Sequence, residues 1–279
     1  KVRTIIEHGN CGAEGDNVKY ELTDDGELVI YGEGKMEDYN DNGPFYEDNN
    51  ITNIIIKEGV TEIGDYAFSG CSYLTSVTIP ESVTWIGKWA FKGCSSLTRV
   101  QFNAKNCTSM GYDYSPVFRY CSQLTSITIG ENVTSIPDNA FYGCSGITSV
   151  TIPKSVTSIG WGAFNCCSSL TCVTIPEGVT VIGESAFSGC DSLTSVTIPK
   201  SVTMIGTGAF YGCKNLRGVT IPDSVTEIGE EAFRDCRSLT SVTIPEGVTE
   251  IGELAFKGCS TLTSVTIPES VTKIGSHAF

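Results

Sequence analysis

The 279-residue chain carries 18 Lys and Arg against 32 Asp and Glu, which gives a formal net charge of −14 at pH 7. This acidic balance argues against a nucleic-acid ligand, whose affinity depends on cations that neutralise phosphates, and against anionic lipid surfaces. No run of 18 apolar residues occurs, so the sequence predicts no insertion into a membrane.

Residues 1–50 differ from the remainder of the chain. Val18–Leu22 and Leu28–Tyr31 alternate or run apolar, and the Thr-Asp-Asp-Gly turn between them predicts a β-hairpin. Residues 32–50 are rich in Gly, Asp and Asn and are expected to form a loop. Three aromatic side chains of this loop should pack on the coil that follows: Tyr39, Phe45 and Tyr46. Because a terminal repeat needs a cover for its apolar face, residues 1–50 are predicted to form an N-terminal β-hairpin cap.

The rest of the chain, residues 51–279, repeats itself. Each repeat contains one Phe at the same position, and this Phe recurs every 23 residues. One copy, residues 92–118, is 27 residues long. The repeat Phe positions are Phe68, Phe91, Phe118, Phe141, Phe164, Phe187, Phe210, Phe233, Phe256 and Phe279. A fixed period of this length is typical of a solenoid, in which stacked coils share one continuous core. The sequence therefore predicts about ten coils, and we expect the solenoid to be truncated at its C-terminus.

Each repeat contains two extended segments. In residues 74–94, apolar residues alternate first around Val77 and Ile79 and again around Val83 and Ile86. β-Branched residues with a period of two predict a longer strand followed by a shorter one. The proline after the first segment ends that strand, because proline has no N–H to donate to a sheet. The Ala-Phe pair and the glycines near it predict a brief helical turn.

Thirteen cysteines are present, and nine of them, called the ladder cysteines below, follow the repeat Phe by three residues. They are Cys71, Cys94, Cys121, Cys144, Cys167, Cys190, Cys213, Cys236 and Cys259. Equivalent positions in stacked coils lie about 4.8 Å apart with parallel side chains, whereas a disulfide needs sulfurs about 2 Å apart and a dihedral angle near 90°. We therefore expect these nine to be reduced core thiols. No CxxC pair occurs and the chain has only 2 histidines, so no metal centre is expected. The remaining four are Cys11, Cys107, Cys166 and Cys172, for which a Cys11–Cys107 bridge is left open.

The repeat pattern LTSVTIPxxVTxIGxxAFxGC is complete in Leu193–Cys213 and Leu239–Cys259. It resembles the BspA-like leucine-rich-repeat proteins. The first 50 residues also look like the N-terminal segment of that family, with Cys-Gly at Cys11, the run DDGELVIYGEGKM and a Pro-Phe-Tyr triplet at residues 44–46. The resemblance implies a right-handed leucine-rich-repeat coil with a parallel β-sheet on the concave face and short second strands and helical turns on the convex side. It also implies secretion or display on a cell surface, adhesion to host proteins and cells, and no enzymatic activity.

Functional positions in a solenoid are expected where the copies differ. The outward positions of the main strand are nearly all Ser and Thr, with Arg99 and Gln101 as exceptions in one copy and Arg217 in another. Arginines on a neutral face are suited to anchoring acidic groups. The alternative is variation without function at solvated positions. The Ser and Thr rows themselves either bind glycans or a protein strand, or pair across strands and stabilise the sheet.

The 27-residue copy is the second departure. Residues 103–117 replace the usual second segment and add four residues, with Tyr112 and Tyr114 on a bulge flanked by Gly and Pro. Tyrosines on loops are common in recognition surfaces, and insertions on repeat scaffolds often lie at binding faces. The alternative is an insertion whose tyrosines pack back on the coil. The predicted binding residues are Arg99, Gln101, Tyr112, Tyr114 and Arg217.

Motifs of catalysis are missing from the sequence. Neither GxSxG nor GxxxxGK[ST] occurs, and neither His8 in the predicted cap nor His277 near the end of the sequence is expected to serve a catalytic nucleophile. The carboxylates occupy variable surface positions where little would desolvate them. We therefore expect neither an enzyme nor a bound cofactor.

The sequence thus predicts a non-enzymatic interaction module, extracellular or on a cell surface, that binds host or other extracellular proteins or glycans. The first alternative is a structural spacer that displays another module of a larger surface protein. A second alternative is a flat array of Ser and Thr rows that binds ice or another crystal. We also expect self-association through the apolar edge of the last coil, residues 262–279.

Overall fold

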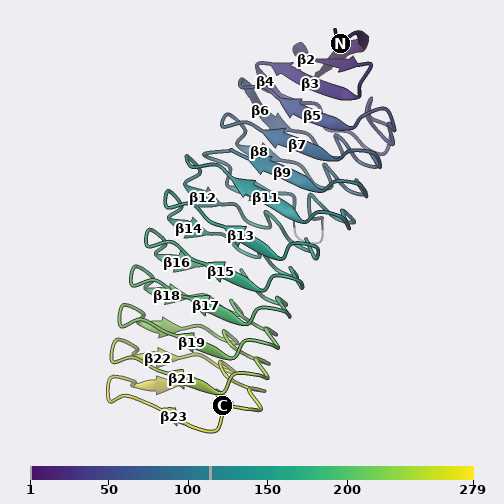
Figure 1. Ribbon diagram of the computed structural model, residues 1–279. Coiled ribbons are helices and arrows are strands. Elements are labelled where there is room, and N and C mark those ends of the chain that lie inside the picture. The colour runs from purple at the N-terminus through teal and green to yellow at the C-terminus, as the bar shows by residue number, and fades with distance from the viewer. Residues whose placement is uncertain (1, 113–114) are drawn as a thin grey trace. The chain divides into compact units, whose positions relative to one another are not determined.

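The computed structural model describes residues 2–112 and 115–279. The chain divides into two compact units, of which unit 1 comprises residues 1–133 and 139–144 and unit 2 comprises residues 134–138 and 145–279. In both units each coil contributes a first strand and a shorter or equal second strand, joined by turns (Figure 1). Each unit is therefore a β-solenoid, as the 23-residue period predicts.

Unit 1 contains a seven-stranded sheet in the order β1-β2-β3-β5-β7-β9-β11. The pairs β1–β2 and β2–β3 are antiparallel, whereas every pair from β3 to β11 is parallel. The second strands form a parallel sheet in the order β10-β8-β6-β4. The bounds are β1 Ile5–Gly12, β2 Gly15–Thr23, β3 Glu27–Gly32, β4 Gly34–Lys35, β5 Asn53–Ile56, β6 Val60–Ile63, β7 Ser76–Ile79, β8 Trp85–Ile86, β9 Arg99–Phe102, β10 Ser109–Met110 and β11 Ser126–Ile129.

Unit 2 repeats the parallel part of this arrangement. Its first strands form a six-stranded sheet in the order β13-β15-β17-β19-β21-β23, and its second strands form a seven-stranded sheet in the order β12-β14-β16-β18-β20-β22-β24. The first strands are β13 Ser149–Thr151, β15 Cys172–Thr174, β17 Ser195–Thr197, β19 Gly218–Thr220, β21 Ser241–Thr243 and β23 Val265–Thr266. The second strands are β12 Ser135–Ile136, β14 Ser158–Ile159, β16 Val181–Ile182, β18 Met204–Ile205, β20 Glu227–Ile228, β22 Glu250–Ile251 and β24 Lys273–Ile274.

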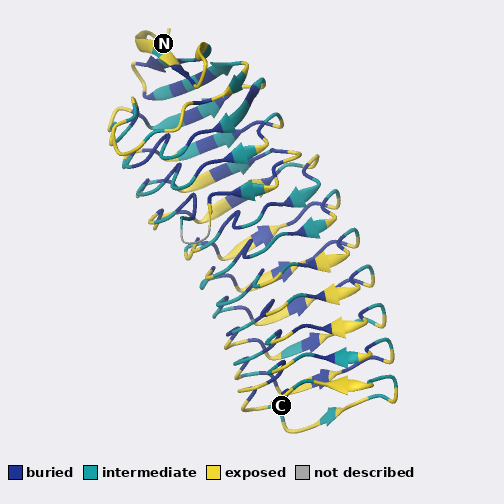
Figure 2. Cartoon of the chain, turned by 180° about the vertical axis from the view of Figure 1, so that it is seen from behind, coloured by how far each residue is buried: buried dark blue, intermediate teal, exposed yellow. Residues whose placement is uncertain are grey.

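The inward residues of the coils form the core. In first strands of unit 2 such as β17 and β21, a buried Val stands between an exposed Ser and an exposed Thr, and Figure 2 shows dark blue and yellow in arrows of this kind. The repeat Phe rings stack on one another inside the coils. The ring centroid of Phe187 lies 5.4 Å from that of Phe164 and 5.5 Å from that of Phe210, with interplanar angles of 6° and 5°. Stacked aromatic pairs at this spacing add to the energy of their apolar burial, so the repeat period sets a ladder of rings.

The predicted helical turns at the Ala-Phe pairs are wrong, because the described residues contain no helix. These segments are turns that bond from coil to coil. The backbone N–H of Phe187 donates to the carbonyl of Ala209 in the next coil at 2.8 Å, and not to a residue four positions earlier as in an α-helix. Gly208 and Gly212 have φ angles of 58° and 69°. This left-handed conformation, which glycine adopts without steric cost, interrupts any helix.

The predicted N-terminal hairpin is confirmed, since β2 and β3 pair antiparallel. The segment that follows also builds most of a coil. β3 and β4 pair in parallel with the first and second strands of the next coil, and the ring of Phe45 stacks on Phe68 at 5.4 Å. The carbonyl of Phe45 accepts a hydrogen bond from the thiol of Cys71 at 3.1 Å. The division of the chain at residue 50 stays a prediction.

The nine ladder cysteines are buried thiols, and no cysteine of the chain forms a disulfide, so the Cys11–Cys107 bridge is not formed. Each thiol of a typical coil donates to the carbonyl of the repeat Phe one coil earlier, as Cys213 does to Phe187 at 3.2 Å. Burial raises the pKa of Cys190 to about 12 and that of Cys213 well above the ordinary value of a thiol. These two thiols are therefore neutral donors inside the core.

Candidate binding surfaces

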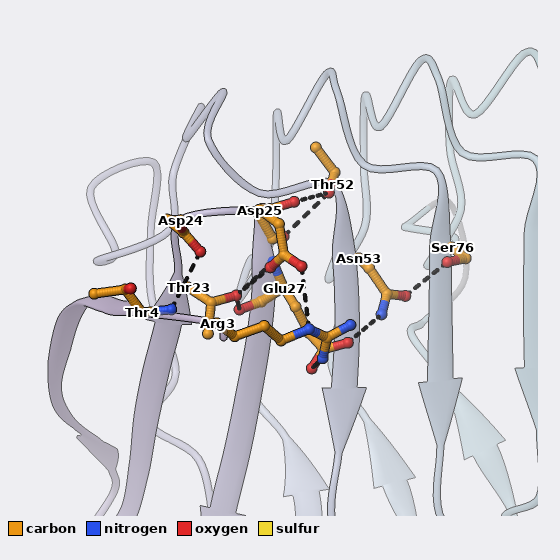
Figure 3. A network of polar contacts seen from close by, with 10 residues as sticks. Arg3, Thr4, Thr23, Asp24, Asp25, Glu27, Thr52, Asn53 and Ser76 are labelled. Carbon is orange, nitrogen blue, oxygen red and sulfur yellow. Dashed lines mark hydrogen bonds and ion pairs between the residues drawn. The ribbon is translucent and has the colours of Figure 1, made fainter. Parts of the chain in front are cut away.

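A chain of polar contacts crosses the first strands of unit 1 (Figure 3). Arg3 forms ion pairs with Asp25, at 3.1 Å, and with Glu27. The amide of Asn53 donates to Glu27 at 3.4 Å, and the hydroxyl of Ser76 donates to Asn53 at 2.6 Å. These outward side chains of β3, β5 and β7 thus satisfy one another. The next outward residue in the same row belongs to β9.

Threonines that precede the first strands join one coil to the next. The hydroxyl of Thr98 donates to the carbonyl of Thr75 at 3.1 Å, and in unit 2 the hydroxyl of Thr194 donates to the carbonyl of Thr171 at 3.2 Å. The threonines before the second strands do the same. These rows have a structural role, so candidate binding residues are the outward positions of the strands themselves.

β9 departs from the other first strands at both outward positions. Arg99 stands in register beside Ser76, and Gln101 beside Thr78. Arg99 is exposed, and the ion pairs of the described residues do not include it. The amide nitrogen of Gln101 donates to the Oδ1 atom of Asn103 at 2.8 Å, which orients this side chain. A guanidinium and an oriented amide therefore share one face of β9, where they are suited to binding a carboxylate or another polar acceptor.

Tyr112 follows β10, at the sheet of second strands. Its side chain is 55% exposed, and its ring meets the ring of Trp85 edge to face at 5.7 Å. The backbone N–H of Ser115 donates to the carbonyl of Tyr112 at 2.9 Å. Tyr114 lies outside the described residues. Arg99 thus lies in β9, in the sheet of first strands, whereas Tyr112 follows a strand of the other sheet, and the structure does not bring the two together on one strand face.

Arg217 belongs to unit 2 and directly precedes β19. Its side chain is exposed, and its carbonyl accepts the hydrogen bond of the Thr240 hydroxyl at 3.1 Å. The backbone at this position thus keeps its place in the threonine row while the side chain differs. The following Gly218 leaves open space, because an added Cβ atom would meet nothing within 4 Å. Arg217 is a separate candidate from the pair on β9.

Two recesses in unit 1 involve residues that the sequence analysis did not single out. A recess of about 470 Å³ between the loop after β4 and two later turns is lined by Asp41, Tyr46, Glu47, Asn49, Ser69, Gly70, Ser72, Lys92 and Gly93. A second recess, of about 350 Å³, is lined by Pro116, Arg119, Tyr120, Tyr142 and Gly143. Both lie at turns between the repeat Phe and the ladder cysteine. The sequence signal there is weak, and consists of a tyrosine at position 120 where most copies have glycine.

Within residues 2–112 and 115–279, no three His, Cys, Asp or Glu side chains gather in a way that could hold a metal ion. The same part of the chain has no helix with the length and apolar character needed to span a membrane.

Comparison with known families gives a match to the family described as BspA type Leucine rich repeat region (6 copies). The matched stretches are residues 41–171, 114–240 and 157–279, which together cover most of the chain. The comparison with curated proteins gives no significant match.

Three bacterial proteins of known structure are similar to the chain. A leucine-rich repeat protein from Eubacterium ventriosum is 25% identical, with a TM-score of 0.48 and coverage of 98% of this chain and 94% of the other. A leucine rich cell surface protein from Faecalibacterium prausnitzii is 28% identical, with a TM-score of 0.44 and coverage of 93% of both chains. A leucine-rich repeat protein from Bacteroides ovatus is 23% identical, with a TM-score of 0.42 and coverage of 100% and 91%.

Proposed function

The chain belongs to the BspA type leucine-rich repeat family, and we propose that it is a non-enzymatic interaction module, secreted or displayed on a cell surface. Its partners in this proposal are host or other extracellular proteins, glycoproteins or cells. The repeats supply a regular sheet of first strands, and binding residues are the few outward side chains that differ from the common Ser and Thr. This division of labour supports adhesion, since it sets a few distinctive side chains on a regular outward face.

The observation that carries the proposal is the pair Arg99 and Gln101 on β9. The neighbouring outward residues of β3, β5 and β7 are engaged with one another, whereas the exposed guanidinium of Arg99 stands beside that chain of contacts. A planar guanidinium binds a carboxylate through two parallel hydrogen bonds. The partner of this site is therefore expected to present an acidic side chain or an acidic sugar to β9. Tyr112 and Arg217 are proposed as further contacts, the latter in unit 2.

The test is binding of the labelled protein to an array of matrix proteins, mucins and glycans at physiological salt. The double variant Arg99→Ser with Gln101→Thr gives β9 the outward residues of β7, so the coil keeps a sequence that already folds in this chain. The variant Arg237→Ser is the matched control, because it removes an exposed arginine of unit 2 that lies at a turn. We expect a saturable partner whose affinity falls at least tenfold in the β9 variant and less than twofold in the control.

An unchanged affinity for every partner in the β9 variant would refute this site. Silence of the wild-type chain across the whole array would favour the second candidate function, a spacer that displays another module. The uniformity of unit 2 supports that candidate, since β17 and β21 present the same exposed Ser and Thr around a buried Val.

A further inference from the structure

The recess of about 350 Å³ in unit 1 lies at the turns that follow the second strands, and not on the sheet that carries Arg99. One coil contributes Pro116, Arg119 and Tyr120, and the next contributes Tyr142 and Gly143. Its volume is at the small end of the range for small-molecule sites. The recess thus suits a single small ring-bearing group better than a folded partner.

Tyr120 is the one aromatic residue among the nine that precede the ladder cysteines, where Cys166 and Asp235 also replace glycine, with φ angles of 59° and 58°. Six of these nine positions are glycine, and the backbone there is left-handed, with φ angles of 74° at Gly93 and 73° at Gly143. Tyr120 adopts the same conformation, with a φ angle of 64°, although a bulky residue is strained in it. Its side chain is nevertheless 63% exposed. Burial of the ring therefore does not compensate the strain. The left-handed backbone also occurs at Tyr66 and Trp89, but their half-buried rings contact each other. The exposed ring of Tyr120 instead lines the recess, which favours a role in binding.

The next coil leaves open space at Gly143, on the wall of the same recess. An added Cβ atom at Gly143 would meet no atom within 4 Å. The half-buried ring of Tyr142 and the buried Pro116 provide further apolar surface beside this gap. Two phenol rings and a proline thus bound a cavity whose apolar surface remains accessible.

Positive charge is concentrated at the same turns. The guanidinium carbon of Arg119 lies 4.9 Å from the centroid of the Tyr120 ring. One coil earlier, the ammonium of Lys92 lies 4.9 Å from the centroid of the Trp89 ring. The N–H of Gly93 donates to the carbonyl of Arg119 at 2.8 Å, so the two cations stand on adjacent turns. A guanidinium that rests on a ring face can still donate its in-plane N–H groups to an anion.

We propose that this recess binds a carboxylated sugar residue, with a face of the sugar ring against Tyr120 and Tyr142 and its carboxylate against Arg119. The combination of flat apolar rings and a forked cation matches a ligand that is apolar on one face and carries one carboxylate. A long polyanion fits less well, because the net charge of −14 would repel its remaining charges. A neutral proline-rich peptide would use the rings but not the cations.

The test is isothermal titration calorimetry of the full chain with sialyllactose, with a glucuronate-terminated disaccharide and with lactose. We expect saturable binding of at least one acidic sugar and at least tenfold weaker binding of lactose. The two acidic probes distinguish between the two sources of the carboxylate, and binding of either supports the proposal. Equal binding of lactose, or binding only of a proline-rich peptide added as a fourth probe, would overturn it.

Variants locate the site. Tyr120→Gly installs the residue that most coils have at this turn, and Arg119→Gln removes the charge with little change in length. Each should weaken binding of the acidic sugar at least tenfold. Tyr73→Ser, which removes a tyrosine that is 60% exposed elsewhere in unit 1, should change it less than twofold. A wild-type affinity in folded Tyr120→Gly protein would refute the siting, whereas loss of binding in Arg99→Ser alone would assign the sugar to β9.

Discussion

Replacement of Cys213 tests whether the ladder thiols act as hydrogen-bond donors or only as apolar filler. The side chain is fully buried, and its thiol donates to the carbonyl of Phe187 at 3.2 Å. That carbonyl also accepts the N–H of Cys190 at 3.3 Å, so it keeps one partner when the thiol is removed. Cys213→Ala therefore loses the burial of one methylene-sized atom, about 0.8 kcal/mol. A cavity of about 25 Å³ costs roughly 0.6 kcal/mol more, and a weak hydrogen bond costs about 0.5 kcal/mol.

The expected loss of stability in Cys213→Ala is thus about 2 kcal/mol. Cys213→Ser keeps a donor within reach of the Phe187 carbonyl, so it should be no less stable than Cys213→Ala. If the thiol were only apolar filler, the serine hydroxyl would be buried without a partner and would cost at least about 1 kcal/mol more than alanine. Urea denaturation followed by circular dichroism measures the difference in the free energy of unfolding between the two variants, provided that both have the same slope of this free energy against urea concentration. A serine variant less stable than the alanine variant by that margin would refute the donor role.

Three further predictions concern the core, the thiols and the strained turn. Phe187→Ala should destabilise the chain by about 3–5 kcal/mol, because it opens a cavity between two stacked rings, as measured by urea denaturation. In native protein, mass spectrometry after iodoacetamide treatment should find label only on the exposed Cys166 and Cys172. Burial, and then the nearby charge of Asp191, raise the pKa of Cys166, so its labelling rate should keep rising with pH above the ordinary thiol range. Tyr120→Gly should leave the melting temperature unchanged or raise it, because it removes backbone strain of about 1 kcal/mol while adding entropy to the unfolded chain.

The repeat period was sufficient to predict the stacking of coils, the two strands of each coil and the buried thiols. It gave the wrong structure for the Ala-Phe segment, because short-range residue preferences do not reveal a backbone bond from Phe187 to Ala209 in the next coil. The early coil around Phe45 could have been found, since this residue lies 23 positions before Phe68 in the sequence. Its strands have an unusual sequence and lack the repeat pattern, so only the pairing of β3 with β5 makes the coil evident.

The candidate sites were harder to predict than the fold. Sequence differences pointed to Arg99 on the main strand and to Tyr112 in the altered second segment, but the contact between the rings of Tyr112 and Trp85 is evident only in the structure. The recess beside Tyr120 is built from two coils whose facing residues are 22 positions apart in the sequence, Tyr120 and Tyr142. Proximity of this kind follows from the repeat, whereas the open space at Gly143 does not.

The strained turn at Tyr120 also shows why a repeat protein can carry a binding residue at a small cost in folding stability. Coils contact only their neighbours, so the strain of one turn adds a local term and does not propagate along the chain. A glycine, as at Gly93 and Gly143, fits the same backbone without strain. A strained residue with a mostly exposed ring contributes little to the core. Tyr120→Gly should therefore weaken binding of the acidic sugar without lowering the stability of the chain. If Tyr120→Gly lowered both the stability and the affinity for an acidic sugar, the ring would be a structural element of the turn and the recess would lose its main support as a binding site.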